Sequence, residues 1–311
     1  MTGNTSLGPG REFDIVRSLF TRWGPLVRGA GDDAASLRVP RGHQLLISTD
    51  TSVEGVHFRR DWISPRDIGY RVVAVALSDL AAMAATPTAV LLAISAPERW
   101  LPDLNELADG AGVAVSLAGA HIVGGDLTAS SELIVGVTVL GTTRHPVLRT
   151  GAVPGDLIYL TGTLGGPAAA AREWYAGGVP RDEWRDRYAR PEPRLSEGRW
   201  FAAQGAHAMI DISDGLLDDA THLAHASGVR IAIDLDAIPV MDGVTRNEAA
   251  VSGDEYELLV AAPAGLDETE FLSRFGVALT TIGRVERGEP IVEATAGGKR
   301  VARQPGFSHF P

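Results

Sequence analysis

The stretch IDISDGLLDD, residues 210–219, brings four carboxylates together directly after a short apolar segment: Asp211, Asp214, Asp218 and Asp219. Two carboxylates about 4 Å apart repel each other by about 4 kcal/mol at an effective dielectric constant near 20. Such side chains extend into water, take up a proton or share a cation. Only the shared cation would make this segment a functional site.

A local alternative needs no ligand. Ser213 or Asp214 can cap a helix that begins at Gly215, because either side chain can accept backbone hydrogen bonds there. Asp218 and Asp219 would then lie at the helix start, where negative charge is favourable. The local sequence leaves both interpretations of DISDG open.

Further acidic residues follow or interrupt apolar segments in both halves of the chain. They are Asp32 and Asp33 in GDDAA, Asp50 in STDTSVEGVHF, Asp79 in LSDLAAM, Asp126 in GGDLT, and Asp254 with Glu255 in SGDEYEL. Ligands of α/β proteins gather beyond the carboxyl ends of strands. Oxygen-rich clusters without cysteine and with little histidine suit Mg²⁺. These acids are therefore candidate magnesium ligands.

Each of these motifs also has a purely structural interpretation. GDD can be a turn, and Asp79 falls on an apolar helix face, where pairing with an arginine would satisfy its charge. His57 follows the acidic strand end and can contact a substrate or be a structural histidine. The glycine-rich turns GGD (124–126) and TGTLGG (161–166) allow backbone amides to approach phosphate. Neither turn matches the phosphate-loop or dinucleotide-binding pattern.

The composition narrows the function classes. The net charge of 28 − 39 = −11 disfavours nucleic-acid binding, which depends on basic contacts to phosphate. The chain has no cysteine, which excludes disulfides and thiolate chemistry and fits a reducing compartment. Its one lysine is Lys299, so cationic phosphate contacts should come from arginine or a metal. No apolar run is long enough for a membrane span and the N-terminus lacks a signal-peptide layout, so we expect a cytoplasmic protein.

Helical and strand patterns alternate along the 311 residues, which predicts an α/β fold with two domains. We expect the first domain to comprise residues 1–145 and the second residues 146–311. The proline- and glycine-containing segment HPVLRTGAVPGD is the expected joint. Ser64 and Pro65 in SPRD predict a helix start. The charged stretch PRDEWRDRYARPEPRL (180–195) is expected to be a solvated surface segment.

In their order and spacing, these motifs resemble those of the thiamine-monophosphate kinases, members of the PurM-like ATP-dependent superfamily. The similarity extends over nearly the whole chain and also includes REFDIVRSLF, DIGYRVVAVALSDLAAMAATP, IGRV and the terminal GFSHF. It implies a homodimer whose N-terminal sheets pair into a barrel-like interface, with a C-terminal domain of packed α/β layers. It also implies direct transfer of the γ-phosphoryl group of ATP to thiamine monophosphate, giving thiamine diphosphate.

The resemblance assigns roles to individual residues. The ligands of several Mg²⁺ ions would be Asp32, Ser48, Thr49, Asp50, Asp79, Asp126, Asp211 and Asp214. Some ligands in the STD segment would be backbone carbonyls. The contacts to ATP would come from Gly125, Asp126, Arg149 and Ser213. The substrate contacts would come from His57, Asp254, Glu255 and Phe307. The catalytic residues would be Asp50, Asp126 and Asp214, while Asp218 and Asp219 remain helix-start residues.

The chain departs from the usual family pattern at three places. Many relatives read GED where this chain has Gly253-Asp254-Glu255, and Asp254 is by position the acid expected to face the substrate. Ala108 stands where an aromatic residue often lies, so an adenine or ribose contact is either missing or supplied from elsewhere. Phe307 replaces a tyrosine or tryptophan; it can still stack on a cationic thiamine ring, or it covers a hydrophobic groove.

Two alternatives to this function remain. One is another PurM-like ATP-using enzyme, such as an aminoimidazole-ribonucleotide synthetase or a hydrogenase-maturation protein. The other is a non-catalytic nucleotide-binding homologue. STDTSVEGVHF and SGDEYEL favour the thiamine enzyme over the first, and the complete set of acids argues against the second.

Overall fold

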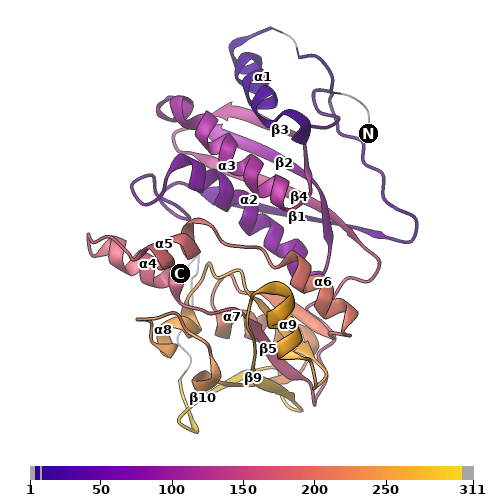
Figure 1. Cartoon of the computed structure of the whole chain (residues 1–311), viewed down its shortest axis with the longest axis vertical. Helices are drawn as coiled ribbons and strands as arrows, with labels where there is room; N and C mark the ends of the chain where they lie inside the picture. Colours follow the sequence, from indigo (N-terminus) through magenta and orange to yellow (C-terminus); the bar gives the residue numbers. More distant parts are fainter. Residues whose placement is uncertain (1–3, 8, 303–311) are drawn as a thin grey trace. The chain divides into compact units, whose positions relative to one another are not determined.

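The computed structural model describes residues 4–7 and 9–302, which form two compact units. The N-terminal unit extends to Arg144 but omits Ala81–Ala84. The C-terminal unit consists of that short segment and the chain from His145 onward. Both units combine helices with a sheet (Figure 1), which confirms the predicted α/β class.

The N-terminal unit contains a four-stranded sheet with the strand order β1-β4-β2-β3. Its strands are β1 (Gln44–Val53), β2 (Thr86–Ala96), β3 (His121–Ala129) and β4 (Ile134–Thr143). Its helices are α1 (Arg11–Trp23), η1 (Gly24–Leu26), α2 (Pro65–Ala82), η2 (Glu98–Asp103) and α3 (Leu104–Leu117). The edge strands are therefore β1 and β3, which carry the STD and GGD motifs.

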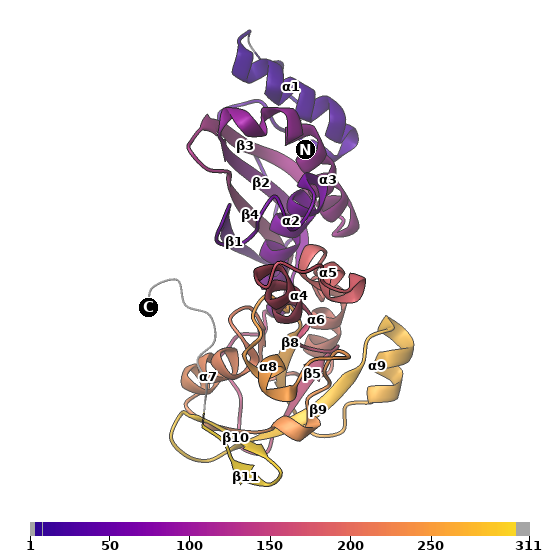
Figure 2. The same ribbon diagram turned by 90° about the vertical axis from the view of Figure 1, so that its left-hand side faces the viewer.

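Helices α2 and α3 cover one face of this sheet (Figure 2). The other face carries exposed apolar side chains of β1, with Leu45 39% and Ile47 62% exposed. Side chains alternate between the two faces along a strand. Ser48 lies on the helix-covered face, because its hydroxyl donates a hydrogen bond to Asp79 of α2.

The start and packing of α2 fix the position of Asp79. The helix begins as predicted, since the Ser64 hydroxyl accepts a hydrogen bond of 3.1 Å from the Asp67 backbone N–H. The backbones of α2 and α3 are in direct contact. A Cβ atom added at Gly69 would lie 1.8 Å from the Leu107 carbonyl oxygen. Such an approach is open only to glycine.

The C-terminal unit contains a seven-stranded sheet with the order β11-β10-β7-β9-β5-β8-β6. Its strands are β5 (Leu157–Thr161), β6 (Ala208–Asp211), β7 (Arg230–Asp234), β8 (Leu258–Ala262), β9 (Leu279–Glu286), β10 (Val292–Ala296) and β11 (Lys299–Arg300). Its helices are α4 (Gly166–Tyr175), α5 (Asp182–Ala189), α6 (Leu195–Ala203), α7 (Leu216–Ser227), η3 (Leu235–Ala237), α8 (Arg246–Val251) and α9 (Glu268–Phe275). Neighbouring strands pair antiparallel, except β10 with β7.

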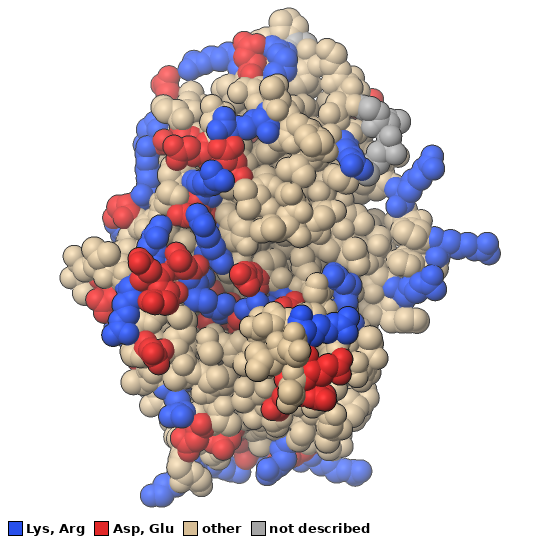
Figure 3. Space-filling model, in the orientation of Figure 1, with Lys and Arg blue, Asp and Glu red and all other residues tan. Residues whose placement is uncertain are grey.

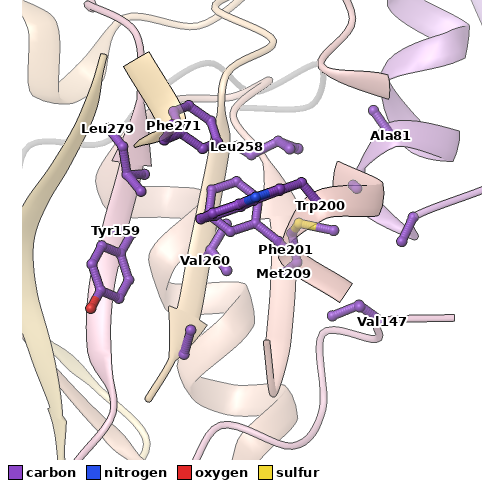
Figure 4. Close-up of a cluster of buried hydrophobic side chains, with 13 residues drawn as sticks. Ala81, Val147, Tyr159, Trp200, Phe201, Met209, Leu258, Val260, Phe271 and Leu279 are labelled. Carbon is purple, nitrogen blue, oxygen red and sulfur yellow. The ribbon is translucent and has the colours of Figure 1, made fainter. Parts of the chain in front are cut away.

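An aromatic core packs against β6 and β8 of this sheet (Figure 4). Trp200 and Phe201 of α6 meet Phe271 of α9, and the Trp200 and Phe271 rings lie edge to face with centroids 5.1 Å apart. Met209 and Val260 bring the two strands into the same cluster. The core thus fixes the strands that end at DISDG and begin after SGDEY.

The prediction of a solvated surface segment at residues 180–195 was wrong. Residues 182–189 form α5, where Trp184 and Tyr188 lie four positions apart on one buried face. The Trp184 indole donates a hydrogen bond of 3.2 Å to the Asp242 carbonyl. Arg194 is also buried, only 6% exposed, so this segment supplies core as well as surface.

Acidic and basic side chains gather in mixed groups in Figure 3, mainly along its left side. Exposed ion pairs such as Arg22–Asp109 and Arg59–Asp61 contribute little to stability. In the described part of the chain, no helix has the length and hydropathy needed to cross a membrane.

Candidate functional site

A cavity of about 450 Å³ lies in the N-terminal unit and contains two of the predicted site acids. Asp32 and Asp126 both line it, together with Gly125. Its apolar walls come from α1, β2 and β3 and include Phe13, Val16, Phe20, Leu91 and Leu127. This volume is within the usual range for a small-molecule site, about 300–1,000 Å³. An apolar wall beside carboxylates suits a ligand with a flat base and a metal-bound polyphosphate.

The GGD motif lies within β3, so the prediction of a glycine-rich turn at residues 124–126 was wrong. The glycines serve a close approach between strands instead. A Cβ atom at Gly125 would lie only 2.0 Å from the carbonyl oxygen of Leu92 on β2. The pairing of β2 and β3 is also irregular between Val90 and Leu91. Glycine is thus required where the strand borders the cavity.

Asp50 and Asp79 form a pair of acids between β1 and α2. Asp50 and Ser48 are two positions apart on β1 and therefore face the same way. The Ser48 hydroxyl donates a hydrogen bond to the Asp79 carboxylate. The structural interpretation of Asp79 was a charge paired with an arginine, and here a serine provides part of that polar contact. Burial and then the negative charge of Asp79 raise the pKa of Asp50. A cation would relieve this repulsion.

Thr49 lies between these residues and faces the opposite side of the sheet. Its hydroxyl oxygen is 3.1 Å from that of Thr138 on β4. A Thr49 ligand on the Asp50 side would therefore have to be its backbone carbonyl. The expectation that the STD segment uses carbonyl ligands is compatible with this arrangement.

Asp50 and Asp126 lie on opposite edge strands of the same sheet. The strand registers align Asp50 with Val137 on β4, Leu92 on β2 and Gly125 on β3. Asp126 is the next residue on β3. Three strand spacings separate the two acids, about 14 Å of sheet. The Asp50 and Asp126 carboxylates of one chain are too far apart to bind the same ion.

The loop after β1 holds His57 in a defined orientation. The imidazole Nδ1 accepts a hydrogen bond of 3.1 Å from the Val53 backbone N–H, which places the proton of the neutral ring on Nε2. The Glu54 carboxylate accepts hydrogen bonds from Arg99 at 2.9 Å and from the Trp100 indole at 2.9 Å. Sequence reasoning missed Glu54, since its partners lie far away along the chain.

In the C-terminal unit, the DISDG loop is folded around Asp219. One oxygen of this carboxylate accepts hydrogen bonds from the backbone N–H groups of Ser213 at 3.0 Å, Asp214 at 3.1 Å and Gly215 at 3.2 Å. Helix α7 has Gly215 as its N-cap and no side-chain cap. The alternative in which Ser213 or Asp214 caps the helix was therefore wrong. Asp219 is more than a helix-start residue, because it shapes the loop that precedes the helix.

The buried or half-buried carboxylates of Asp211 and Asp214 place negative charge next to Asp219. Asp211 is 4% and Asp219 2% exposed. Burial, followed by the charges of Asp211 and Asp214, raises the pKa of Asp219 to about 7. The loop is therefore a concentrated negative site that favours a cation.

The segment 253–257 lies directly against the DISDG loop. The Asp254 N–H donates to the Ser213 carbonyl and the Tyr256 N–H to the Ile212 carbonyl, both at 2.8 Å. Asp254 and Tyr256 adopt left-handed backbone conformations with φ of 62° and 54°. The Tyr256 hydroxyl donates to the Asp254 carboxylate at 2.8 Å. The two acidic motifs of this unit thus form one structure.

Only one acid of the SGDEYEL motif is accessible. Glu255 is 1% exposed, and its carboxylate accepts a hydrogen bond of 2.5 Å from the Gly165 N–H. Asp254 is half-buried. This placement favours Asp254 as the substrate-facing acid. Glu255 is enclosed by the protein and would not reach a bound substrate.

Comparisons with known proteins agree with this arrangement of motifs. The AIR synthase related protein family models match at residues 31–143 for the N-terminal domain and 153–294 for the C-terminal domain. Thiamine-monophosphate kinase of Mycobacterium tuberculosis is 38% identical over 267 residues, 84% of this chain and 79% of the relative. The Salmonella typhimurium enzyme of that name is 34% identical over 319 residues, 96% of each chain. The chain belongs to the thiamine-monophosphate kinase family.

Solved structures extend the similarity to the fold. Thiamine-monophosphate kinase from Stenotrophomonas maltophilia has a TM-score of 0.82 and 32% identity, covering 96% of this chain and 99% of the other. AaThiL complexed with AMPPCP and TMP has a TM-score of 0.77 and 29% identity, covering 96% and 97%. The hydrogenase maturation protein HypE in complex with ATP has a TM-score of 0.79 at 18% identity, which shows the fold alone.

In this member of the thiamine-monophosphate kinase family, the predicted site residues fall into both units. The N-terminal unit holds Asp32, Ser48, Thr49, Asp50, His57, Asp79, Gly125 and Asp126. The C-terminal unit holds Arg149, Asp211, Ser213, Asp214, Asp254 and Glu255. Arg149 is exposed, and Phe307 lies outside the described residues. No three acidic or histidine side chains of the described residues converge on one point as a preformed metal cage.

Proposed function

We propose that this chain transfers the γ-phosphoryl group of ATP to the phosphate of thiamine monophosphate, giving thiamine diphosphate. The observation that carries the proposal is the similarity to AaThiL complexed with AMPPCP and TMP, over 96% of this chain. AMPPCP is an ATP analogue, so that complex combines both kinds of reactant. The likeness to HypE, at 18% identity, favours no second function.

The cavity of the N-terminal unit supports ATP as one substrate. Its apolar wall offers a surface for an adenine ring, and Gly125 with Asp126 lies at the same cavity. Ala108 is fully buried and its carbonyl accepts a hydrogen bond of 2.7 Å from the Trp23 indole. We assign the base contact to the cavity wall that contains Phe13 and Phe20, in place of the aromatic that Ala108 replaces.

The acids fit Mg²⁺ in their chemistry and grouping. All are hard oxygen donors, and Mg²⁺ is commonly bound by one or two carboxylates plus substrate phosphates. Asp50 with Asp79, and Asp211 with Asp214, provide such pairs, and the raised pKa of Asp50 marks a charge that lacks full compensation. Asp32 and Asp126 would serve at the cavity. When bound, Mg²⁺ neutralises phosphate oxygens and holds the attacking and leaving oxygens in line.

The residues of the chain bind and orient, and none has to remove a proton. The acceptor phosphate is already ionised near neutral pH, so its oxygen can attack without a general base. His57 and Asp254 would hold the thiamine monophosphate molecule, with Phe307 as a further contact. The catalytic contribution of the chain is then positioning and electrostatics.

We also propose a homodimer in which each active site uses both copies. The exposed face with Leu45 and Ile47 offers the apolar surface for such an interface. The two edge strands carry Asp50 and Asp126, which are too distant within one chain to share an ion. Two-fold pairing of β1 with β3 of a second copy would place the two acid-bearing strands side by side, and it would leave no edge strand of this four-stranded sheet open.

One assay tests the proposed reaction. Purified protein is incubated with ATP, Mg²⁺ and thiamine monophosphate, and thiamine diphosphate is measured by chromatography. We expect stoichiometric formation of thiamine diphosphate and ADP. Intact ATP binding without any product would contradict the kinase and leave a nucleotide-binding homologue.

A further inference from the structure

Glu255, which is buried, and Arg187, which is partly buried, form an ion pair at the segment that carries Asp254. The Glu255 side chain is fully enclosed, and its second carboxylate oxygen lies 3.6 Å from Nη2 of Arg187. Its first oxygen accepts the hydrogen bond from Gly165. One side chain therefore joins the Gly-rich turn 161–166 to the acidic segment 253–257.

Arg187 makes the same connection from the other side. Its Nη2 donates to the Glu255 carbonyl at 3.3 Å and to the Thr163 carbonyl at 3.4 Å. It also contacts the fully buried Glu257 carboxylate at 2.9 Å. Arg194 binds Glu257 with two hydrogen bonds of 2.8 and 2.6 Å, so the charge of Glu257 is balanced without Arg187. Arg187 can thus bind the backbone of both the turn 161–166 and the segment 253–257.

The backbone around Glu255 needs such support. Asp254 and Tyr256, the residues on either side, both have left-handed conformations, which are unfavourable for residues other than glycine. Strained backbone of this kind persists only where the surroundings hold it. The hydrogen bonds of Gly165 and Arg187 to Glu255 hold the residue between the two strained positions, and so set the direction of the Asp254 carboxylate.

We propose that Glu255 and Arg187 are positioning residues for the Asp254 carboxylate. By joining the turn 161–166 to the segment 253–257, they fix this carboxylate in the position where it meets thiamine monophosphate. This inference rests on the proposed function for the identity of the substrate. Asp254 touches the substrate, whereas Glu255 and Arg187 act through it. Their loss should weaken binding of thiamine monophosphate and leave ATP binding unchanged.

The test compares three variants. Glu255→Ala removes the carboxylate that accepts from the Gly165 N–H and faces Arg187, but keeps the backbone carbonyl to which Arg187 donates. Glu255→Gln keeps an acceptor for the Gly165 N–H. Arg185→Gln is the matched control, because Arg185 lies on the same helix and its side chain is 37% exposed in a pair with Asp186. We expect Glu255→Ala to raise the KM for thiamine monophosphate about tenfold, the effect of leaving one buried backbone N–H without its acceptor. Glu255→Gln should restore most of the affinity, and Arg185→Gln should match the wild type.

Amide hydrogen exchange supplies a readout that needs no substrate. In Glu255→Ala, exchange should accelerate at both residues 163–166 and residues 253–257, and remain unchanged in the rest of the C-terminal unit. If Glu255→Ala does not fold, Arg187→Lys is used, because one ammonium group cannot reach both carbonyls and Glu257 together. The same rise in KM is expected.

The outcomes separate this inference from the proposed function. Unchanged exchange in both segments would overturn the positioning role, as would a fall in kcat at constant KM. A wild-type protein that makes no thiamine diphosphate would refute the reaction, while the exchange data would still decide whether Glu255 and Arg187 hold the segment.

Discussion

The carboxylate of Asp219 accepts a hydrogen bond of 3.1 Å from the backbone N–H of Asp214, five residues earlier in the chain. Two neighbouring N–H groups bind the same oxygen. The backbone of Asp214, a proposed metal ligand, is thus held by the buried Asp219 carboxylate. We infer that Asp219 sets the direction of the Asp214 side chain.

Replacing Asp219 with alanine should lower kcat by about 100-fold, because a ligand displaced by about 1 Å loses that much rate. Asp219→Asn keeps an acceptor oxygen and should retain more activity than the alanine variant. Asp218→Ala is the matched control on the adjacent, less buried position, and it should remain close to the wild type. Steady-state kinetics with saturating ATP checks the order. Equal losses in the Asp218 and Asp219 variants would show that the loop does not depend on Asp219.

The separation of Asp50 and Asp126 on opposite edge strands predicts complementation between inactive variants. Asp50→Asn and Asp126→Asn should each abolish most turnover while the proposed dimer persists. When the two are co-refolded, half of the dimers are mixed and each mixed dimer has one intact site. Activity should then return to about a quarter of the wild-type value for sites shared between copies. No recovery, with mixed dimers demonstrated by mass, would place both acids of each site in one chain.

Burial of Glu255 predicts a pH-dependent stability difference. Burial, opposed by Arg187, raises the pKa of this carboxyl from 4.5 to about 7. Between pH 4.5 and about 7, the folded protein therefore binds a proton that the unfolded chain releases. The stabilisation from this bound proton is lost as the pH rises through about 7. Glu255→Gln does not titrate. Its stability relative to the wild type should increase by up to about 3 kcal/mol from low to high pH.

Urea unfolding of the two proteins between pH 5 and 8 checks this direction. Asp219 also has a pKa of about 7, but it titrates in both proteins and its contribution cancels in the difference. Arg187 and Glu257, the charged groups that face Glu255, are likewise present in both. A constant difference across this pH range would show that Glu255 is ionised throughout.

The secondary-structure elements that hold several candidate acids could be predicted from the sequence, because these acids follow or interrupt apolar segments with clear periodicity. Asp50 and Asp211 lie in strands, and Asp79 lies on the predicted helix. The helix start at Ser64 also follows from local hydrogen-bonding rules. Such features depend on neighbours in the chain, so their pattern is visible without the fold.

Other features depend on partners that are distant in the chain. Arg194 and Glu257 are 63 residues apart, and the surrounding charges of residues 180–195 favoured a solvated segment. Only the spacing of Trp184 and Tyr188 indicated a buried face. For Asp219, the sequence shows its place in the first helical turn but not the loop that curls back onto it.

The contact between Gly125 and Leu92 predicts a difference between two adjacent glycines. An alanine Cβ at Gly125 would lie 2.0 Å from the Leu92 carbonyl, whereas at Gly124 the nearest atom is a Leu91 methyl at 3.7 Å. Gly125→Ala should therefore push β3 away from β2, destabilise the N-terminal unit by about 1–3 kcal/mol and weaken ATP binding at the cavity. Gly124→Ala should fold with the stability of the wild type. Thermal unfolding and ATP titration of both variants test this, and equal behaviour of the two would contradict the close approach of β3 to β2.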